Sequence, residues 1–323
     1  MGKIVIVGAT HSGKSCYFYG MMRKLMTGIH GFSICTEPKD YGDIRRAIKR
    51  LNDVSLPLEQ RFPAPNSERR TYKLKLQYNL AVLEEFDWED YPGEFVETKV
   101  DEFIRLLDGA DSLLLCVDGE GIQGDPEDLD NLADDLIDFW NCMDLNNALA
   151  QAAVATEVFP PVCIMITKYD KVDPAFRQGE ILTELMKKIF PILFRKKDIN
   201  GKNRLVTICP VTLGKDLDQG GRLAPKNVEK PICFATYLIQ LAKVRQMEKQ
   251  AQDYISAHKA KIEEYNKQNP FKKLITQKPE PLTQEQIAAV QELINGAAED
   301  LDAIRATIEQ LPLYLNGEPI KWN

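Results

Sequence analysis

The 323-residue sequence lacks any apolar run that approaches the length of a membrane-spanning helix. Hydrophobic residues make up 44% of the chain and charged residues 28%, close to the averages for globular proteins. A secretory signal is also missing, because Gly2 and Lys3 lead directly into an apolar strand pattern. Ile6 stands where N-myristoylation requires Ser or Thr. We therefore expect a soluble cytoplasmic protein with no integral membrane segment and no N-terminal lipid anchor.

The sequence also lacks an even, closely spaced set of cysteines. Its seven cysteines are scattered and often lie inside apolar runs, so we expect them to be reduced packing residues. The formal net charge of −7 argues against a general nucleic-acid-binding surface. A local basic patch is still compatible with this value.

A glycine-rich motif follows the first apolar run, residues 3–7. It fits the pattern G-x-x-x-x-G-K-[ST], in which backbone N–H groups surround phosphate oxygens before a helix begins. The helix N-terminus adds further N–H donors and the positive end of its dipole. Lys14 can reach β- and γ-phosphates, and the Ser15 hydroxyl can ligate Mg²⁺. The expected phosphate-binding residues are Gly8, Ala9, Thr10, His11, Ser12, Gly13, Lys14, Ser15 and Cys16.

A second motif, D-x-x-G, comes at the end of a strand pattern over residues 81–87. Its carboxylate is Asp90, which can hold Mg²⁺, usually through water. Its glycine is Gly93, whose backbone N–H can lie beside a γ-phosphate. In isolation the same residues also describe an ordinary acidic turn.

A third motif follows the apolar run over residues 162–166, which is typical of a buried parallel strand. Thr167, Lys168 and Asp170 fit the guanine-recognition pattern [NT]-K-x-D. The Asp170 carboxylate can accept hydrogen bonds from guanine N1–H and the exocyclic amine, whereas adenine offers no such pair. The aliphatic part of Lys168 can lie along the base, and Thr167 can connect the motif to the phosphate loop.

These three motifs, in this order, resemble the translation-factor-related class of P-loop GTPases, which includes Ras-like proteins. The resemblance covers roughly residues 1–243. It implies a three-layer α/β domain with a mostly parallel central sheet that binds GTP or GDP with Mg²⁺. Segments 62–65 and 224–231 look like features of the bacterial double-GTPase-like domains within this class.

The resemblance also implies a base-contacting loop after the strand expected at residues 205–210. The usual Ser-Ala pair is missing there. Val211 and Thr212 take its place, and their backbone N–H groups are expected to face guanine O6.

The residues that would act in GTP hydrolysis are less regular. In this class, the segment before the third strand normally contains a switch threonine that binds Mg²⁺ and senses the γ-phosphate. Here the segment is long and includes a predicted inserted helix at residues 40–51. Thr71 and Ser67 are both candidates for that threonine's role, and we take Thr71 as the catalytic candidate. Glu94 replaces the glutamine that positions the attacking water in Ras-like proteins, so we expect slow hydrolysis with Lys14, Glu94 and Thr71 at the reaction centre.

Other polar residues near this centre have ordinary explanations. Arg69 and Arg70 stand where an arginine could neutralise transition-state charge, but adjacent arginines in a polar loop are more often simply solvated. His11 is better explained as a partly exposed loop residue than as a contact to the γ-phosphate.

The remaining residues, 244–323, have a different pattern. Apolar residues at spacings of three and four continue the last domain helix, and Asn269 and Pro270 should end it. A second helix opens at the capping sequence Thr283-x-x-Gln286, and the two helices are expected to form an antiparallel hairpin. Asn316 and Gly317 predict a tight turn near the C-terminus, with Trp322 available to pack. The hairpin is compatible with either a partner-binding arm or a structural brace.

Together these patterns predict a guanine-nucleotide-dependent molecular switch that hydrolyses GTP slowly and acts on a protein effector or regulator. A pseudo-GTPase scaffold that binds nucleotide without turnover is one alternative, favoured by Glu94. An ATP-dependent P-loop enzyme is a second alternative, in which Asp170 would have no role.

Overall fold

The structure is a computed structural model that describes residues 2–64, 69–92, 95–178, 180–196, 203–267, 280 and 283–322, apart from the side chains of residues 97, 285–287 and 290. The chain divides into two compact units. The first contains Met1–Thr236 and Thr307–Asn323, and the second contains Tyr237–Ala306.

A mixed sheet forms the centre of the first unit. Its nine strands among the described residues lie in the order β2-β3-β4-β1-β5-β6-β7-β8-β9. The five central strands, from β4 to β7, are parallel, and the pairs at both edges are antiparallel. This confirms the predicted α/β class with a parallel central sheet. The strands are β1 (Gly2–Val7), β2 (Phe32–Thr36), β3 (Arg70–Tyr78), β4 (Ala81–Asp90), β5 (Ser112–Asp118), β6 (Val162–Thr167), β7 (Leu205–Pro210), β8 (Leu313–Leu315) and β9 (Glu318–Ile320).

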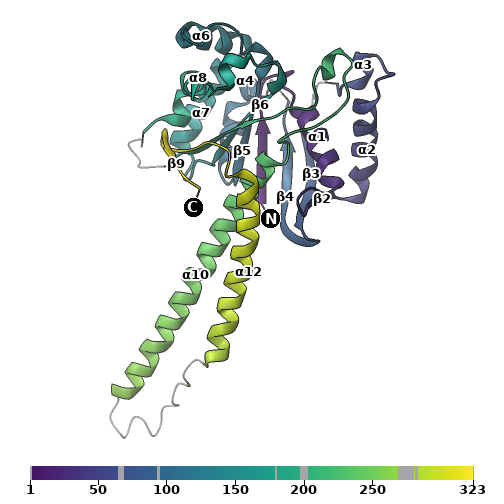
Figure 1. Cartoon of the computed structure of the whole chain (residues 1–323). Coiled ribbons are helices and arrows are strands. Elements are labelled where there is room, and N and C mark those ends of the chain that lie inside the picture. The colour runs from purple at the N-terminus through teal and green to yellow at the C-terminus, as the bar shows by residue number, and fades with distance from the viewer. Residues whose placement is uncertain are drawn as a thin grey trace. The chain divides into compact units, whose positions relative to one another are not determined.

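Helices cover both faces of this sheet (Figure 1). Because alternate residues of a strand point to opposite faces, Val5 and Leu113 enter one apolar core, where they meet Leu149 and Met186 from the helices. Both faces of β1, β5 and β6 are buried, which explains why these three strands read as apolar runs. The helices of this unit are α1 (Lys14–Met26), α2 (Pro38–Asn52), α3 (Leu58–Arg61), α4 (Phe95–Thr98), α5 (Val100–Leu107), α6 (Leu129–Phe139), α7 (Met143–Ala155), α8 (Ile181–Ile189) and α9 (Pro191–Phe194).

The helix predicted at residues 40–51 is confirmed as α2. Pro38 lies in its first turn, where a missing N–H costs nothing and the fixed φ favours a helix. Lys49 and Arg50 lie in its last turn, where they complement the negative end of the helix dipole.

Two long helices account for the second unit. α10 (Lys230–Lys267) begins in the first unit and continues as a single helix, as the apolar spacing predicted. α12 (Gln284–Ile308) follows the predicted capping residue Thr283. Asn269 and Pro270, the predicted end of the first helix, lie outside the described residues, and the antiparallel pairing stays a prediction.

The C-terminal residues return to the sheet. The predicted turn is present, with Asn316 at φ 54° and Gly317 at φ 83°, and it joins β8 to β9. Trp322 packs edge-on against Phe234, with ring centroids 6.0 Å apart, and its Nε1 donates to the Leu311 carbonyl at 2.9 Å. The chain end therefore extends the sheet, beyond the short terminal turn that the sequence predicted.

No helix within the described ranges is both long enough and apolar enough to cross a membrane.

Candidate functional site

The glycine-rich loop turns tightly between β1 and α1, and two of its glycines are required by geometry. Gly8 has φ 155°, and a Cβ added there would lie 2.3 Å from the Cys116 carbonyl oxygen. Gly13 has φ 89° and directly precedes the first residue of α1. Side chains are strained in both conformations, so this path is open only to glycine. The loop therefore brings its backbone to the N-terminus of α1, as a phosphate-binding site requires.

Lys14 lies across this loop. Its Nζ donates to the Gly8 carbonyl at 2.6 Å and to the Ala9 carbonyl at 2.9 Å. Burial lowers the pKa of Lys14, while the nearby Cys116 and Asp90 act to raise it. Because phosphate oxygens would favour the protonated amine, an anion in this loop would reverse the effect of burial.

Ser15 and Asp90 bring two oxygen ligands together at the same edge of the sheet. Parallel pairing places Asp90, at the end of β4, beside Ile6 near the end of β1. Ser15 Oγ lies 3.4 Å from Asp90 Oδ2. A hydroxyl and a carboxylate suit Mg²⁺, so these two side chains fit the predicted metal site.

The third motif is connected directly to the phosphate loop. Thr167 Oγ1 lies 2.7 Å from the Ser12 carbonyl oxygen and 3.0 Å from that of Val117, so its hydroxyl can donate to either. The sequence predicted that Thr167 connects the motif to the loop, and this contact is present.

Lys168 and Asp170 occupy the turn that follows β6. Lys168 has φ 46°, and its Nζ bonds Asp118 at 2.6 Å and Glu120 at 3.0 Å. Burial alone would lower the pKa of Lys168, but these two acidic partners raise it. The Asp170 backbone carbonyl accepts from Arg177 Nη2 at 2.9 Å. Two carboxylates thus hold the Lys168 amine, and Lys168 is one of the residues that line a cavity.

A cavity of about 580 Å³ joins the phosphate loop to the third motif. Lys14, Ser15 and Cys16 line one part of it, and Thr167, Lys168 and Asp170 line another. Two further segments complete its walls, and sequence analysis did not assign them to the site. They contribute Glu59, Phe62, Pro63 and Ala64 on one side, and Leu213, Gly214, Leu217 and Asp218 on the other.

A second cavity, of about 220 Å³, lies beside the same loop. Ala9 and Ser12 line it, and Thr10 and His11 line both cavities. His11 is exposed, with φ 67°. The loop therefore lies between two cavities, and the residues of the predicted guanine motif line the larger one.

Val211 and Thr212, expected to contact the base through their backbone, are not among the described residues that line the larger cavity. The Val211 N–H donates to the Ile166 carbonyl at 2.8 Å, and the Thr212 N–H donates to that of Lys226 at 3.2 Å. Leu213 and Gly214 line the cavity instead. The candidates for a backbone contact to a base are therefore Leu213 and Gly214, each two residues beyond the expected position.

The residues expected at the reaction centre are only partly described. Thr71 is exposed on β3 and pairs with Glu89 of β4, next to the pairing of Arg70 with Asp90. Gly93, Glu94 and Ser67 lie outside the described residues. Arg69 forms an ion pair with the buried Glu89, which accounts for it without a catalytic role.

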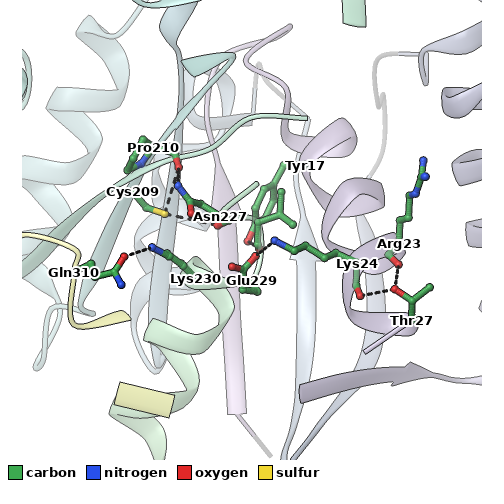
Figure 2. A network of polar contacts seen from close by, with 11 residues as sticks. Tyr17, Arg23, Lys24, Thr27, Cys209, Pro210, Asn227, Glu229, Lys230 and Gln310 are labelled. Atoms are coloured by element: carbon green, nitrogen blue, oxygen red, sulfur yellow. Dashed lines mark hydrogen bonds and ion pairs between the residues drawn. The ribbon is translucent and has the colours of Figure 1, made fainter. Parts of the chain in front are cut away.

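A network of polar contacts connects α1 to the residues just before α10 (Figure 2). Tyr17 Oη donates to the Val228 carbonyl at 3.0 Å, and Lys24 Nζ pairs with Glu229 Oε2 at 2.9 Å. Asn227 Nδ2 donates to the Pro210 carbonyl at 3.0 Å, at the end of β7. The helix that carries Lys14 and Ser15 is therefore fixed by contacts outside the cavity.

No protein-family model and no curated protein matches the chain. Among solved structures, a mutation variant of SsGBP aligns at 13% identity over 66% of this chain, with a TM-score of 0.30, so the match spans half (50%) of that protein. The SRb–GTP/SRX complex of the signal recognition particle receptor from Chaetomium thermophilum aligns at 14% identity over 59% of this chain and 79% of that one, with a TM-score of 0.32. The GTP-bound Ski7 GTPase-like domain of S. cerevisiae aligns at 12% identity over 67% of this chain and 44% of that one, with a TM-score of 0.35. These values are too low to establish a function for this chain.

Proposed function

We propose that this chain is a guanine-nucleotide-binding molecular switch that binds GTP and GDP with Mg²⁺ and hydrolyses GTP slowly. The observation that carries the proposal is the cavity that Lys14 and Ser15 share with Lys168 and Asp170. Residues of the predicted phosphate-binding and base-selecting motifs, which are far apart in the sequence, line one cavity. Neither motif alone would support this function.

In the proposed complex, the phosphates lie at the N-terminus of α1, with Lys14 released from its loop carbonyls to meet them. The guanine base lies against the aliphatic part of Lys168, and Asp170 accepts its N1–H and amine hydrogens. Gly214, rather than Val211 or Thr212, is the better candidate for a backbone contact to the base edge, because it lines the cavity.

Ser15 and Asp90 would hold Mg²⁺, which supplies charge neutralisation to the phosphates when bound. Thr71 is the sequence's candidate for the switch oxygen, but its pairing with Glu89 directs its side chain to the face of the sheet opposite to Asp90, so it is not placed in this metal site. Glu94 is the proposed residue beside the attacking water. An anion at Glu94 would repel the γ-phosphate, which is the reason to expect a slow rate.

A pseudo-GTPase scaffold is the second candidate function, because glutamate replaces the water-positioning glutamine at Glu94. Single-turnover hydrolysis of GTP by the nucleotide-free chain with Mg²⁺ separates the two. GDP formation above the uncatalysed rate supports the switch, and none supports the scaffold. In either case the expected partner is a protein effector or regulator.

The binding experiment uses the purified chain after removal of co-purified nucleotide with a chelator. Fluorescent GDP, GTP and ADP are titrated with and without Mg²⁺ against the native chain, Asp170→Ala and Lys14→Ala. The matched controls are Asp43→Ala and Lys39→Ala, whose side chains are exposed on α2. We expect a guanine preference that Asp170→Ala removes, and weaker binding of every nucleotide by Lys14→Ala. Equal ADP binding, or no binding, would reject the proposal.

A further inference from the structure

Arg61, the last residue of α3, is almost completely buried, with 1% of its surface exposed. Its guanidinium donates to three backbone carbonyls, which belong to two segments that are far apart in the sequence. Nη2 donates to Leu51 at 3.0 Å and to Gly221 at 2.7 Å, and Nη1 approaches Leu217 at 3.5 Å. Leu51 lies in α2, whereas the other two carbonyls belong to a segment more than 150 residues away in the chain.

These partners are carbonyl oxygens, and none of the ion pairs found within the described ranges includes Arg61. Burying a guanidinium is costly, and hydrogen bonds must replace the lost water. The planar fork of Arg can bond several carbonyls at once in a fixed geometry. The contact therefore fixes the position of the carbonyls that it reaches.

The segment that Arg61 reaches is a closed loop, residues 213–224. The Ala224 N–H donates to the Leu213 carbonyl at 2.6 Å, and Thr212 pairs with Lys226 just outside. Apart from one short 3₁₀ turn, Leu217–Gln219, this loop has no regular structure. The loop has only a few backbone hydrogen bonds of its own, and Arg61 adds two contacts from outside it.

Each end of this contact forms one wall of the larger cavity. Glu59 and Phe62, on either side of Arg61 in the sequence, line the cavity with Pro63 and Ala64. Loop 213–224 lines it with Leu213, Gly214, Leu217 and Asp218. The loop also contacts the residue that follows the predicted guanine motif, because Lys171 Nζ pairs with Asp218 Oδ2 at 3.2 Å. The two walls therefore meet near the proposed base position.

We propose that Arg61 is a positioning residue that holds these two walls together and so sets the affinity for guanine nucleotides without touching them. This inference rests on the proposed function. Loss of the guanidinium releases the wall that contains Gly214 and Leu217. Binding of the base weakens, whereas contacts to the phosphates at α1 are retained.

The test compares the native full chain with Arg61→Met and Arg61→Lys. Arg46→Met, an exposed arginine of α2, is the matched control. Binding of GDP and ADP is measured by titration, and hydrogen exchange of residues 213–224 is measured without nucleotide. For Arg61→Met we expect the GDP affinity to fall at least about tenfold, which corresponds in free energy to the loss of one hydrogen bond to a charged group. The ADP affinity should change much less. Exchange in loop 213–224 should accelerate.

Arg61→Lys keeps the charge but reaches fewer carbonyls, so it should lose GDP affinity to a smaller extent. If Arg61→Met does not fold, Arg61→Lys alone tests whether the Arg61 side chain sets the GDP affinity. Unchanged GDP affinity and loop exchange in the folded variants would overturn the proposal, as would equal losses for GDP and ADP. If the native chain binds no nucleotide, the proposed function fails, while the exchange rates still decide whether Arg61 holds the loop.

Discussion

The Thr167 hydroxyl lies 2.7 Å from the Ser12 carbonyl oxygen, and this contact joins the predicted guanine motif to the predicted phosphate loop. Thr167 is buried at the end of β6, and its hydroxyl also lies 3.0 Å from the Val117 carbonyl at the end of β5. One hydroxyl thus connects three segments that are widely separated in sequence. These contacts fix the distance between the proposed phosphate and base positions.

Replacing Thr167 with valine keeps the shape and removes this hydroxyl. The change leaves buried carbonyls with one donor fewer, so we expect the chain to lose about 1 to 3 kcal/mol of stability and to bind GDP more weakly. Urea unfolding and nucleotide titration measure the two effects. Thr27→Val, which removes an exposed hydroxyl at the end of α1, should have little effect on either. Equal behaviour of the two variants would contradict the assigned role.

Cys16 gives a chemical readout of the same cavity. Burial raises the pKa of its thiol to about 12, although the nearby Lys168 acts to lower it. Since only the thiolate reacts, iodoacetamide should label Cys16 far more slowly at pH 8 than the exposed Cys35. The rate of Cys16 labelling should rise about tenfold per pH unit between pH 7 and 10, because the thiolate fraction of Cys16 grows by that factor below its pKa.

Bound GDP should protect Cys16, which lines the cavity, and leave Cys35 unchanged. Peptide mass spectrometry after timed alkylation measures both sites in one sample. Labelling of Cys16 as fast as Cys35 at pH 8 would contradict the raised pKa of the Cys16 thiol.

Much of the site was predictable because each motif is local. The phosphate loop, Asp90 and the Thr167 motif all follow apolar strands, and the parallel order of β4, β1, β5 and β6 brings these strand ends to one edge. Short patterns therefore singled out Lys14, Ser15 and Asp170, which line one cavity in the structure.

The remaining walls depend on long-range contacts that no local pattern records. Loop 213–224 meets the segment after α3 through the buried Arg61, and the sequence gives no periodic signal for that meeting. Val211 and Thr212 were chosen by resemblance, but their N–H groups are used within the chain. β8 and β9 have three residues each, too short for the alternation that identifies strands.

The ion pair between Lys24 and Glu229 should stabilise the contact of α1 with the start of α10. The Glu229 side chain is only 8% exposed, so Lys24→Met leaves its carboxylate poorly solvated and without this partner. We expect a loss of about 2 kcal/mol, measured as a shift of the urea midpoint. The double variant Lys24→Met/Glu229→Gln should recover part of it. Lys75→Met, in an exposed pair, is the control, and an equal loss there would contradict this account.

Gly8→Ala tests the geometry of the phosphate loop. Gly8 has φ 155°, and a Cβ added there would lie 2.3 Å from the Cys116 carbonyl oxygen. We therefore expect the variant to lose at least about 2 kcal/mol of stability and to lose nucleotide binding. Gly296→Ala is the opposite case, because that glycine lies inside α12 with open space around it. It should stabilise the helix by about 0.5 to 1 kcal/mol. Calorimetric unfolding that ranks the two variants in reverse would contradict the prediction.

The most direct test of the central claim is calorimetric titration of GDP and xanthosine diphosphate into the native chain and Asp170→Asn. Xanthine carries a carbonyl where guanine carries its amine, so the asparagine amide can donate to xanthine while the aspartate cannot. The hydrogen bond from Arg177 uses the backbone carbonyl of residue 170 and survives the exchange. The account predicts that Asp170→Asn loses at least about a hundredfold in GDP affinity and gains xanthosine diphosphate binding. Unchanged GDP affinity in this variant would show that Asp170 does not select guanine and would contradict the central claim.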